Sequence, residues 1–382
     1  MAPMNLRDIP EDLVLDILTG LPVKALKRFR CVCKAWCDLF GNPDFINKHC
    51  IKQTILKNQS FFVNHYDETD ECNSVISIFE SDGDEVLNFT ETIPIPFSEV
   101  FLNNPIIIGS CNGIVCVSDG VENIGFWNPA TREYKPLPPL IPSIDPPVVP
   151  VDVHSNWKLG LGFDQRTKDY KILSFVLTYF EAYDVAVDEA QLYSLKNDSW
   201  REIPSFPVFA GDVVRGSICF KGDCYWLAYR DDPAYNFEDT PYILSFNMAD
   251  EKFEKFELPD FGLSINDYIL ELGMFNGTLA VILYTRPGRL FDIWVMEEYG
   301  VTESWVKKWS IEAVSGLATI SGLVWPLGFL RNYGVFFEDD GGQLVLYGKN
   351  SHVFKNLRLC GRKNELQVVK YVESLIPIDG RQ

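Results

Sequence analysis

The chain has 382 residues, 47% of them hydrophobic and 14% aromatic, and a formal net charge of −19. This composition excludes an extended disordered protein, and the length exceeds what one hydrophobic core usually supports, so we expect at least two folding units. The acid excess also argues against nucleic acid as a ligand, because phosphate groups are repelled by it.

The charge is distributed unevenly. Residues 1–50 hold seven Lys or Arg against six Asp or Glu, and the remainder holds 27 against 47. We expect a solvated acidic surface downstream, and the alternative is an acidic surface that attracts a basic partner. The first residues contain no basic segment leading into an apolar one, and no apolar run is long enough to span a bilayer. We therefore expect a protein of the reducing cytosol or nucleus without membrane contact.

The first fifty residues have helical patterns. Pro10 suits a first helical position, and Leu13 and Ile17 are spaced to share one face. Three helices are predicted, at residues 10–18, 23–30 and 33–40, with the last ending before Pro43. A unit of about forty residues is at the lower limit of independent stability, so we expect it to bury spare apolar surface against something else.

From about residue 60 the sequence changes to short β-type runs separated by turn residues. Residues 106–117 predict a hairpin around Asn112-Gly113, because Asn-Gly suits the positive φ angles of a tight turn. Similar hairpins are predicted at residues 220–227 and 274–282.

A second unit alternates with these hairpins and consists of an aromatic strand, a polar turn and a short closing run. Its five copies are marked by Trp127, Tyr193, Phe246, Val295 and Leu346, in steps of 66, 53, 49 and 51 residues. A period near 50 with about four strands per unit predicts a propeller, and an irregular β-sandwich is the alternative. Insertion loops at residues 136–150 and 179–190 would account for the longest step.

No pattern typical of an enzyme is present. The four histidines and ten cysteines lack metal-ligand spacing, and we interpret the cysteines as buried free thiols. Gly160 and Gly162 lack the third glycine of a dinucleotide loop, and the chain has no GxSxG or HExxH motif. We therefore expect no catalytic residue, no cofactor and no metal.

Residues 9–36 begin with Ile9-Pro10 and an acidic pair, continue through an aliphatic helix to Leu21-Pro22, and end at Trp36. This order closely resembles the plant F-box motif. Downstream, the segments at 111–113, 127–132, 160–164 and 293–305 resemble the F-box-associated domain of plant F-box/kelch-like proteins. Within that family, the segments at 225–226, 242–246 and 371–377 are most similar to S-locus F-box proteins.

These resemblances imply an α+β multidomain chain, with a small three-helix F-box at residues 5–50 followed at 60–380 by an all-β, propeller-like domain of about 50-residue repeats. They imply the substrate-recognition subunit of an SCF-type (Skp-cullin-F-box) ubiquitin ligase. The F-box would bind a Skp-type adaptor, which holds a cullin and a RING subunit. The acidic domain would bind a protein target, expected to be basic, and the S-locus resemblance suggests an S-ribonuclease of pollen self-incompatibility.

The adaptor would contact an apolar ridge on the helices, and each ridge residue could instead pack inside the unit. The expected contact residues are Ile9, Pro10, Leu13, Ile17, Leu21, Pro22, Leu26, Val32 and Trp36. The sequence identifies no substrate-binding residue.

Two other functions stay open. One is a non-catalytic scaffold or regulator that acts without ligase assembly. The other is a helix-turn-helix DNA-binding protein, since the short helices carry Lys24, Lys27, Arg28, Arg30 and Lys34. Pro22 and the near-neutral charge of the unit weaken this second alternative.

Overall fold

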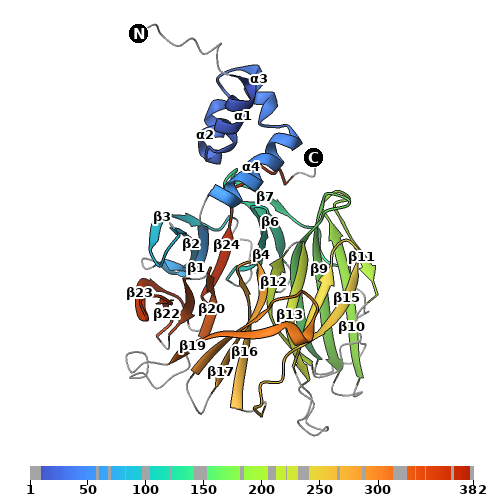
Figure 1. Cartoon of the computed structure of the whole chain (residues 1–382). Helices are drawn as coiled ribbons and strands as arrows, with labels where there is room; N and C mark the ends of the chain where they lie inside the picture. Colours follow the sequence, from blue (N-terminus) through green and yellow to red (C-terminus); the bar gives the residue numbers. More distant parts are fainter. Residues whose placement is uncertain are drawn as a thin grey trace.

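The structure is a computed structural model that describes residues 10–56, 60–67, 70–81, 83–96, 104–120, 123–141, 153–180, 185–204, 212–220, 222–230, 241–264, 267–285, 290–312, 325–331, 333–339, 341–362 and 365–378. A helical unit at one end is followed by a β-rich body (Figure 1). None of the helices among the described residues is long and apolar enough to cross a membrane.

The helical unit contains α1 (Glu11–Thr19), α2 (Val23–Phe29), α3 (Lys34–Leu39) and α4 (Pro43–Leu56). The first three helices confirm the prediction, but α4 was missed because Pro43 was interpreted as a stop. Asn42 Oδ1 accepts hydrogen bonds from the backbone N–H groups of Asp44 (2.8 Å) and Phe45 (3.4 Å). Asn42 is therefore an N-cap, and Pro43 occupies the first helical position, where a missing N–H costs nothing. The three-helix description was wrong, and α4 continues past residue 50.

The described β-strands form six four-stranded antiparallel sheets, which confirms the propeller and rejects the sandwich. The first blade combines the first three strands with the last one: β1 (Ser60–Asp67), β2 (Asp70–Ser81), β3 (Leu87–Pro94) and β24 (Gln367–Tyr371). The second blade contains β4 (Ile106–Cys111), β5 (Ile114–Ser118), β6 (Ile124–Asn128) and β7 (Glu133–Pro136). The third contains β8 (Val153–Asp164), β9 (Asp169–Phe180), β10 (Val185–Ser194) and β11 (Ser199–Ile203).

The fourth blade contains β12 (Asp212–Phe220), β13 (Asp223–Arg230), β14 (Tyr242–Asn247) and β15 (Lys252–Glu257). The fifth contains β16 (Tyr268–Phe275), β17 (Thr278–Thr285), β18 (Leu290–Met296) and β19 (Trp305–Glu312), with a 3-10 turn at Thr302–Ser304 before β19. The sixth contains β20 (Trp325–Leu330), β21 (Gly334–Glu338), β22 (Gln343–Gly348) and β23 (Val353–Cys360).

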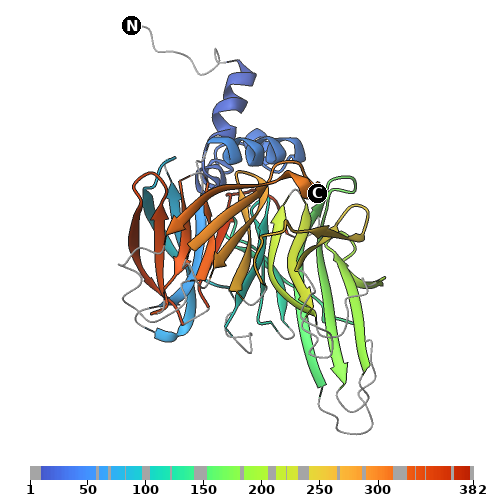
Figure 2. The same ribbon diagram turned by 60° about the horizontal axis from the view of Figure 1, so that its bottom comes forward.

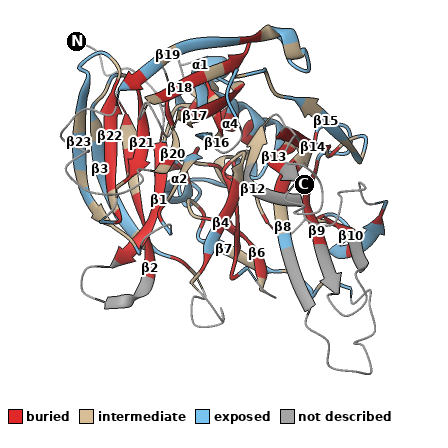
Figure 3. Cartoon of the chain, turned by 90° about the horizontal axis from the view of Figure 1, so that it is seen from below, coloured by how far each residue is buried: buried red, intermediate tan, exposed pale blue. Residues whose placement is uncertain are grey.

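The ring closes by pairing the two ends of the β body. β24 pairs antiparallel with β1, from Ser60 opposite Tyr371 to Asn64 opposite Gln367. The innermost strands β4, β8, β12, β16, β20 and β24 contact one another in sequence around the axis, and β24 returns to β4. Seen from below, the blades stand around this centre (Figure 3). This pairing closes the ring, and each blade keeps one outer edge strand: β3, β7, β11, β15, β19 and β23.

The predicted local units are present in the blades. The three Gly-containing hairpins join first and second strands, and the five aromatic units are third and fourth strands. The stretch at 179–190 was wrongly assigned to a loop, because β9 continues to Phe180 and β10 begins at Val185. These strands, β8 to β10, extend beyond the other blades (Figure 2).

The core lies between and within the blades. Every residue of β5, β6 and β21 is buried. Neighbouring blades pack through aromatic rings, as where Phe62 stacks on Trp127 with ring centroids 6.2 Å apart. The interpretation of the cysteines as buried holds for Cys116 and Cys224, whereas Cys31 and Cys33 are exposed.

Candidate functional site

Five of the nine predicted adaptor contacts are exposed on the helical unit. Leu13 is 54% exposed, Ile17 58% and Val32 63%, and Pro10 and Pro22 are also exposed. Leu13 and Ile17 are one turn apart on α1 and therefore share a face. Exposed aliphatic side chains at helical spacing are a surface that a partner can cover.

The other predicted contacts differ in position. Leu26 is fully buried, so it stabilises the helical unit and is not available to a partner. We therefore correct its assignment. Leu21 is half-buried and packs against the same core as Leu26. Ile9 lies outside the described residues.

Trp36 is half-buried between two other aromatic rings. Its ring centroid lies 5.6 Å from that of Phe29 and 6.2 Å from that of Phe40. Trp36 could either contact the adaptor or pack the helices together, and its ring contacts are those of helix packing.

Two exposed aliphatic residues were missed by sequence reasoning. Ile51 and Ile55 on α4 are 61% and 70% exposed and lie one turn apart. Helix α4 is held to α1 by an ion pair between Lys52 Nζ and Asp16 Oδ1, at 2.5 Å. The four-residue spacing was present in the sequence, but without the helix it had no structural meaning.

The helical unit is attached to the propeller by polar contacts. The Val23 N–H donates to Glu373 Oε2 at 3.1 Å, and Lys27 Nζ donates to the Thr131 carbonyl at 2.6 Å. Within the unit, Gln53 Nε2 donates to the carbonyls of Thr19 and Leu21, each at 3.2 Å. Helix α4 thereby fixes the turn between α1 and α2.

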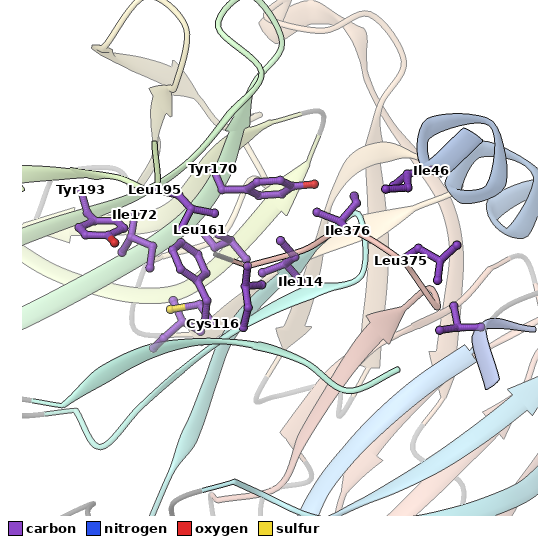
Figure 4. Packing of buried hydrophobic residues seen from close by; sticks show 14 of the residues in the cluster. Ile46, Ile114, Cys116, Leu161, Tyr170, Ile172, Tyr193, Leu195, Leu375 and Ile376 are labelled. Atoms are coloured by element: carbon purple, nitrogen blue, oxygen red, sulfur yellow. The ribbon is translucent and has the colours of Figure 1, made fainter. Parts of the chain in front are cut away.

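The segment after β24, residues 372–378 (the C-terminal tail), lies between the helical unit and the propeller. Asn128 Nδ2 donates to the carbonyls of Ser374 (3.0 Å) and Ile376 (2.8 Å), and all of these groups are buried. Figure 4 shows Leu375 and Ile376 between Ile46 of α4 and the propeller strands. The tail therefore completes one core shared by both parts.

A glycine permits this path of the tail. A Cβ on Gly113 would lie 2.4 Å from Ser374 Cβ and 2.5 Å from the Val372 carbonyl oxygen. Gly113 also has φ +84°, which glycine adopts without a steric penalty. Because the tail covers the Asn-Gly turn, the hairpin signal in the sequence also marks a contact point.

The centre of the propeller is hollow. A cavity of about 880 Å³ is lined by residues of the innermost strands, including Gly109, Gly273 and Gly328. Its charged lining residues are Lys158, Glu271, Arg331, Glu338 and Lys370. The inner hairpin turns at 112–113 and 276–277 border it. The Asn112 carbonyl is 3.9 Å from Cys50 Sγ of α4, so these turns face the helical unit.

Reactive groups are not concentrated at any of these places. Within the described ranges, no group of three or more His, Cys, Asp or Glu residues could hold a metal ion. Burial raises the pKa of Cys50 to about 11 and holds that of Cys111 far above its ordinary value. These thiols are protonated at neutral pH and are weak nucleophiles.

Comparison with known proteins adds a family relationship. The model of the F-box domain matches residues 6–48, and that of the F-box associated beta propeller domain matches residues 69–378. An F-box/kelch-repeat protein of Arabidopsis thaliana is 27% identical, over 91% of this chain and 88% of its own length. The F-box protein CPR1 of the same plant is 26% identical, over 96% of this chain and 88% of its own. A lectin solved in complex with alpha methyl fucoside aligns with a TM-score of 0.38 and 11% identity, over 80% of this chain and 94% of its own, which carries no functional argument.

Proposed function

The chain belongs to the family of plant F-box proteins with an F-box associated beta propeller domain, and from this premise we propose that it is the substrate-recognition subunit of an SCF-type ubiquitin ligase. F-box proteins are generally non-catalytic adaptors of ubiquitin ligase complexes. The F-box implies binding to a Skp-type adaptor, which links it to a cullin and a RING subunit. The cytosol or nucleus is the compartment that we propose for this role.

One observation carries the proposal. The F-box keeps Leu13, Ile17 and Val32 exposed, whereas other apolar residues belong to the buried core that it shares with the propeller, namely Leu18, Val23, Leu26 and Phe40. Burying an aliphatic side chain of this size contributes about 1.5–3 kcal/mol before the costs of association. These three residues therefore form the proposed adaptor surface.

We propose that the substrate binds at the end of the propeller opposite the F-box. The helices stand together at one end, and the far end is free of them (Figure 1). The shared core and the C-terminal tail hold the F-box helices and the propeller in one relative orientation. A rigid connection of this kind would present a bound substrate at a defined position relative to the adaptor.

The substrate that we propose is a basic protein. The support is the charge balance downstream of residue 50, with 27 Lys or Arg against 47 Asp or Glu. Opposite charge accelerates encounter more than it raises affinity. The similarity of a few segments to S-locus F-box proteins suggests a basic S-ribonuclease as one such substrate, and this narrower assignment is a proposal only.

Capture from plant tissue with wild-type and Leu13→Asp/Ile17→Asp proteins tests this function. Deletion of the F-box is a poor control, because it would uncover the core that includes Leu375 and Ile376. We expect the double variant to lose the adaptor and to retain the proteins bound by the propeller. A reconstituted ligase should modify those proteins only with the wild-type chain. Equal capture of the adaptor by both proteins would refute the proposal.

A further inference from the structure

The central cavity has the size and the lining of a small-molecule site. Ligand-binding cavities are typically about 300–1,000 Å³ and combine apolar walls with a few polar groups. Here the cavity of about 880 Å³ has apolar walls that include Leu272, Met274 and Phe329. Five charged side chains line it, three of them cationic, in a chain whose net charge is −19. The lining of the cavity thus has a small excess of positive charge, three cations against two carboxylates, in a chain that is acidic as a whole.

Two of the cations lack a partner. Lys158, Glu271 and Glu338 each have an interaction within the chain. The side chains of Arg331 and Lys370 form no hydrogen bond or ion pair with the residues that the structure describes. Arg331 follows β20 and Lys370 lies in β24, and these innermost strands are neighbours in the ring. Two cations near each other without a counterion repel, so a ligand that supplies negative charge would stabilise them.

The backbone at Arg331 strengthens this point. Arg331 has φ +43°, and it is the first turn residue of its inner hairpin. The first turn residues of two other inner hairpins are Asn112 (φ +51°) and Asn276 (φ +51°), and both line the cavity. Leu330 pairs with Gly334, so the turn at Arg331 is one residue longer than these two. Asparagine adopts this left-handed conformation far more readily than arginine. An arginine at this position is locally unfavourable, and strained residues of this kind are frequent at ligand sites.

We propose that the central cavity binds a small phosphorylated organic anion whose phosphate lies between Arg331 and Lys370. The guanidinium offers a planar pair of donors for two phosphate oxygens, and the ammonium adds a compact point charge. The apolar walls would contact the organic part of the ligand. Lys370 remains exposed to solvent, but partial desolvation and then the neighbouring Arg331 charge lower its pKa, so an anion placed between the two cations would favour the charged form of Lys370.

This site is independent of the function proposed above, since it does not involve the exposed residues of the F-box. It opens a way for a metabolite to affect the propeller, because Lys370 belongs to β24, the strand that closes the ring by pairing with β1.

The test uses the full chain and inorganic pyrophosphate as the probe, with citrate as a carboxylate comparator, in isothermal calorimetry. Arg331→Asn removes the charge and introduces a residue that adopts positive φ angles readily, so the turn should be preserved. Lys370→Met keeps the length of the side chain without its charge. Lys168→Asn is the matched control, because Lys168 has φ +55°, lies in the β8–β9 turn and does not line the cavity.

We expect pyrophosphate to bind the wild-type chain and the Lys168→Asn variant equally. Arg331→Asn and Lys370→Met should each weaken binding by about tenfold to a hundredfold, the usual cost of losing a hydrogen bond to a charged group. The thermal midpoint of Lys370→Met without ligand should be unchanged or raised, because an unfavourably placed charge is removed. Absence of pyrophosphate binding to the wild-type chain, or equal binding to all variants, would overturn the proposal. Tighter binding of citrate than pyrophosphate would overturn the assignment to phosphate.

Discussion

The backbone N–H of Val23 donates a 3.1 Å hydrogen bond to Oε2 of Glu373, across a separation of 350 positions in the chain. Val23 begins α2, where the first N–H groups have no partner within the helix and a carboxylate is favourable. Glu373 follows the strand that closes the propeller. One contact thus links the orientation of the F-box to the closure of the ring.

The C-terminal tail should be a main source of stability. Ile376 is 5% exposed, and Ile376→Ala should lower the free energy of unfolding by about 2–5 kcal/mol, the usual cost of emptying a buried aliphatic site. Chemical denaturation of the full chain measures this. Val353→Ala is the control, because Val353 is 57% exposed and its truncation should cost less than about 0.5 kcal/mol. Equal effects of the two substitutions would show that the tail is not part of the core.

The buried position of Leu26 separates packing from binding in the F-box. Leu26→Ala should destabilise the chain by about 2–5 kcal/mol, whereas Ile17→Ala, at a 58% exposed position, should change stability little. Thermal unfolding and adaptor capture of both variants provide the comparison. Ile17→Ala should weaken capture without unfolding. If it destabilises the chain as much as Leu26→Ala does, the assignment of Ile17 to the surface is wrong.

Lys171 forms a buried ion pair with Asp164 inside the third blade and also contacts the fourth blade. Lys171 Nζ lies 2.9 Å from Asp164 Oδ2, 2.9 Å from the Met248 carbonyl oxygen and 2.9 Å from Glu251 Oε1. Asp164→Asn leaves the buried Lys171 charge with less compensation and should cost roughly 3–5 kcal/mol. The double variant Asp164→Asn/Lys171→Met should recover part of this loss in chemical denaturation. No recovery would mean that the unpaired charge is not the cause.

The same pair should give a defined pH dependence. Burial alone would raise the pKa of Asp164, but hydrogen bonds from Lys171 and Thr167 hold it well below its ordinary value. The stabilisation is therefore fully present above the unfolded pKa of about 3.9 and is lost as the pH falls toward the folded value. The stability difference between wild type and Asp164→Asn should be constant from about pH 7 to 5 and shrink below about pH 4. A difference that grows in acid would contradict this account.

Association with a basic substrate should depend on salt. The Debye length is about 8 Å at about 0.15 M ionic strength, so the field of the acidic surface is screened there. For a basic protein captured by the propeller, we expect the association rate to fall several-fold between low and physiological salt, with a smaller change in dissociation. Stopped-flow kinetics provides both rates. An association rate that is independent of salt would exclude electrostatic steering.

Local signals in the sequence predicted much of the fold. Asn-Gly at 112–113 and 276–277 predicted hairpins because few residues tolerate the required φ angles, and the aromatic units occurred once in each of five of the six blades. The first blade was harder to recognise, since β24 comes from the opposite end of the chain. Pairing across such a separation leaves no periodic trace.

The candidate sites were predicted less completely. Helical spacing correctly placed Leu13 and Ile17 on one face, but it could not separate exposed from buried apolar residues. Leu26, for example, is buried in a core to which residues from much later in the sequence contribute. Ile51 and Ile55 were missed because a proline can mark either the end of one helix or the first position of the next, and Pro43 was interpreted as an end. Arg331 and Lys370 line the same cavity only because the ring of blades is closed, so no local sequence motif could connect them.

The affinity of the full chain for a purified Skp-type adaptor tests the central claim most directly. Isothermal calorimetry compares wild type with Leu13→Asp/Ile17→Asp, and Val353→Asp serves as a control that places the same substitution on one exposed propeller residue. All three proteins should unfold at similar temperatures, because the changed residues are exposed. We predict tight binding of the wild type and the control, and at least about a hundredfold loss for the double variant, as expected when charge is placed in the apolar centre of an interface. Undiminished binding of a folded double variant would contradict the claim that the exposed face of α1 is the adaptor surface.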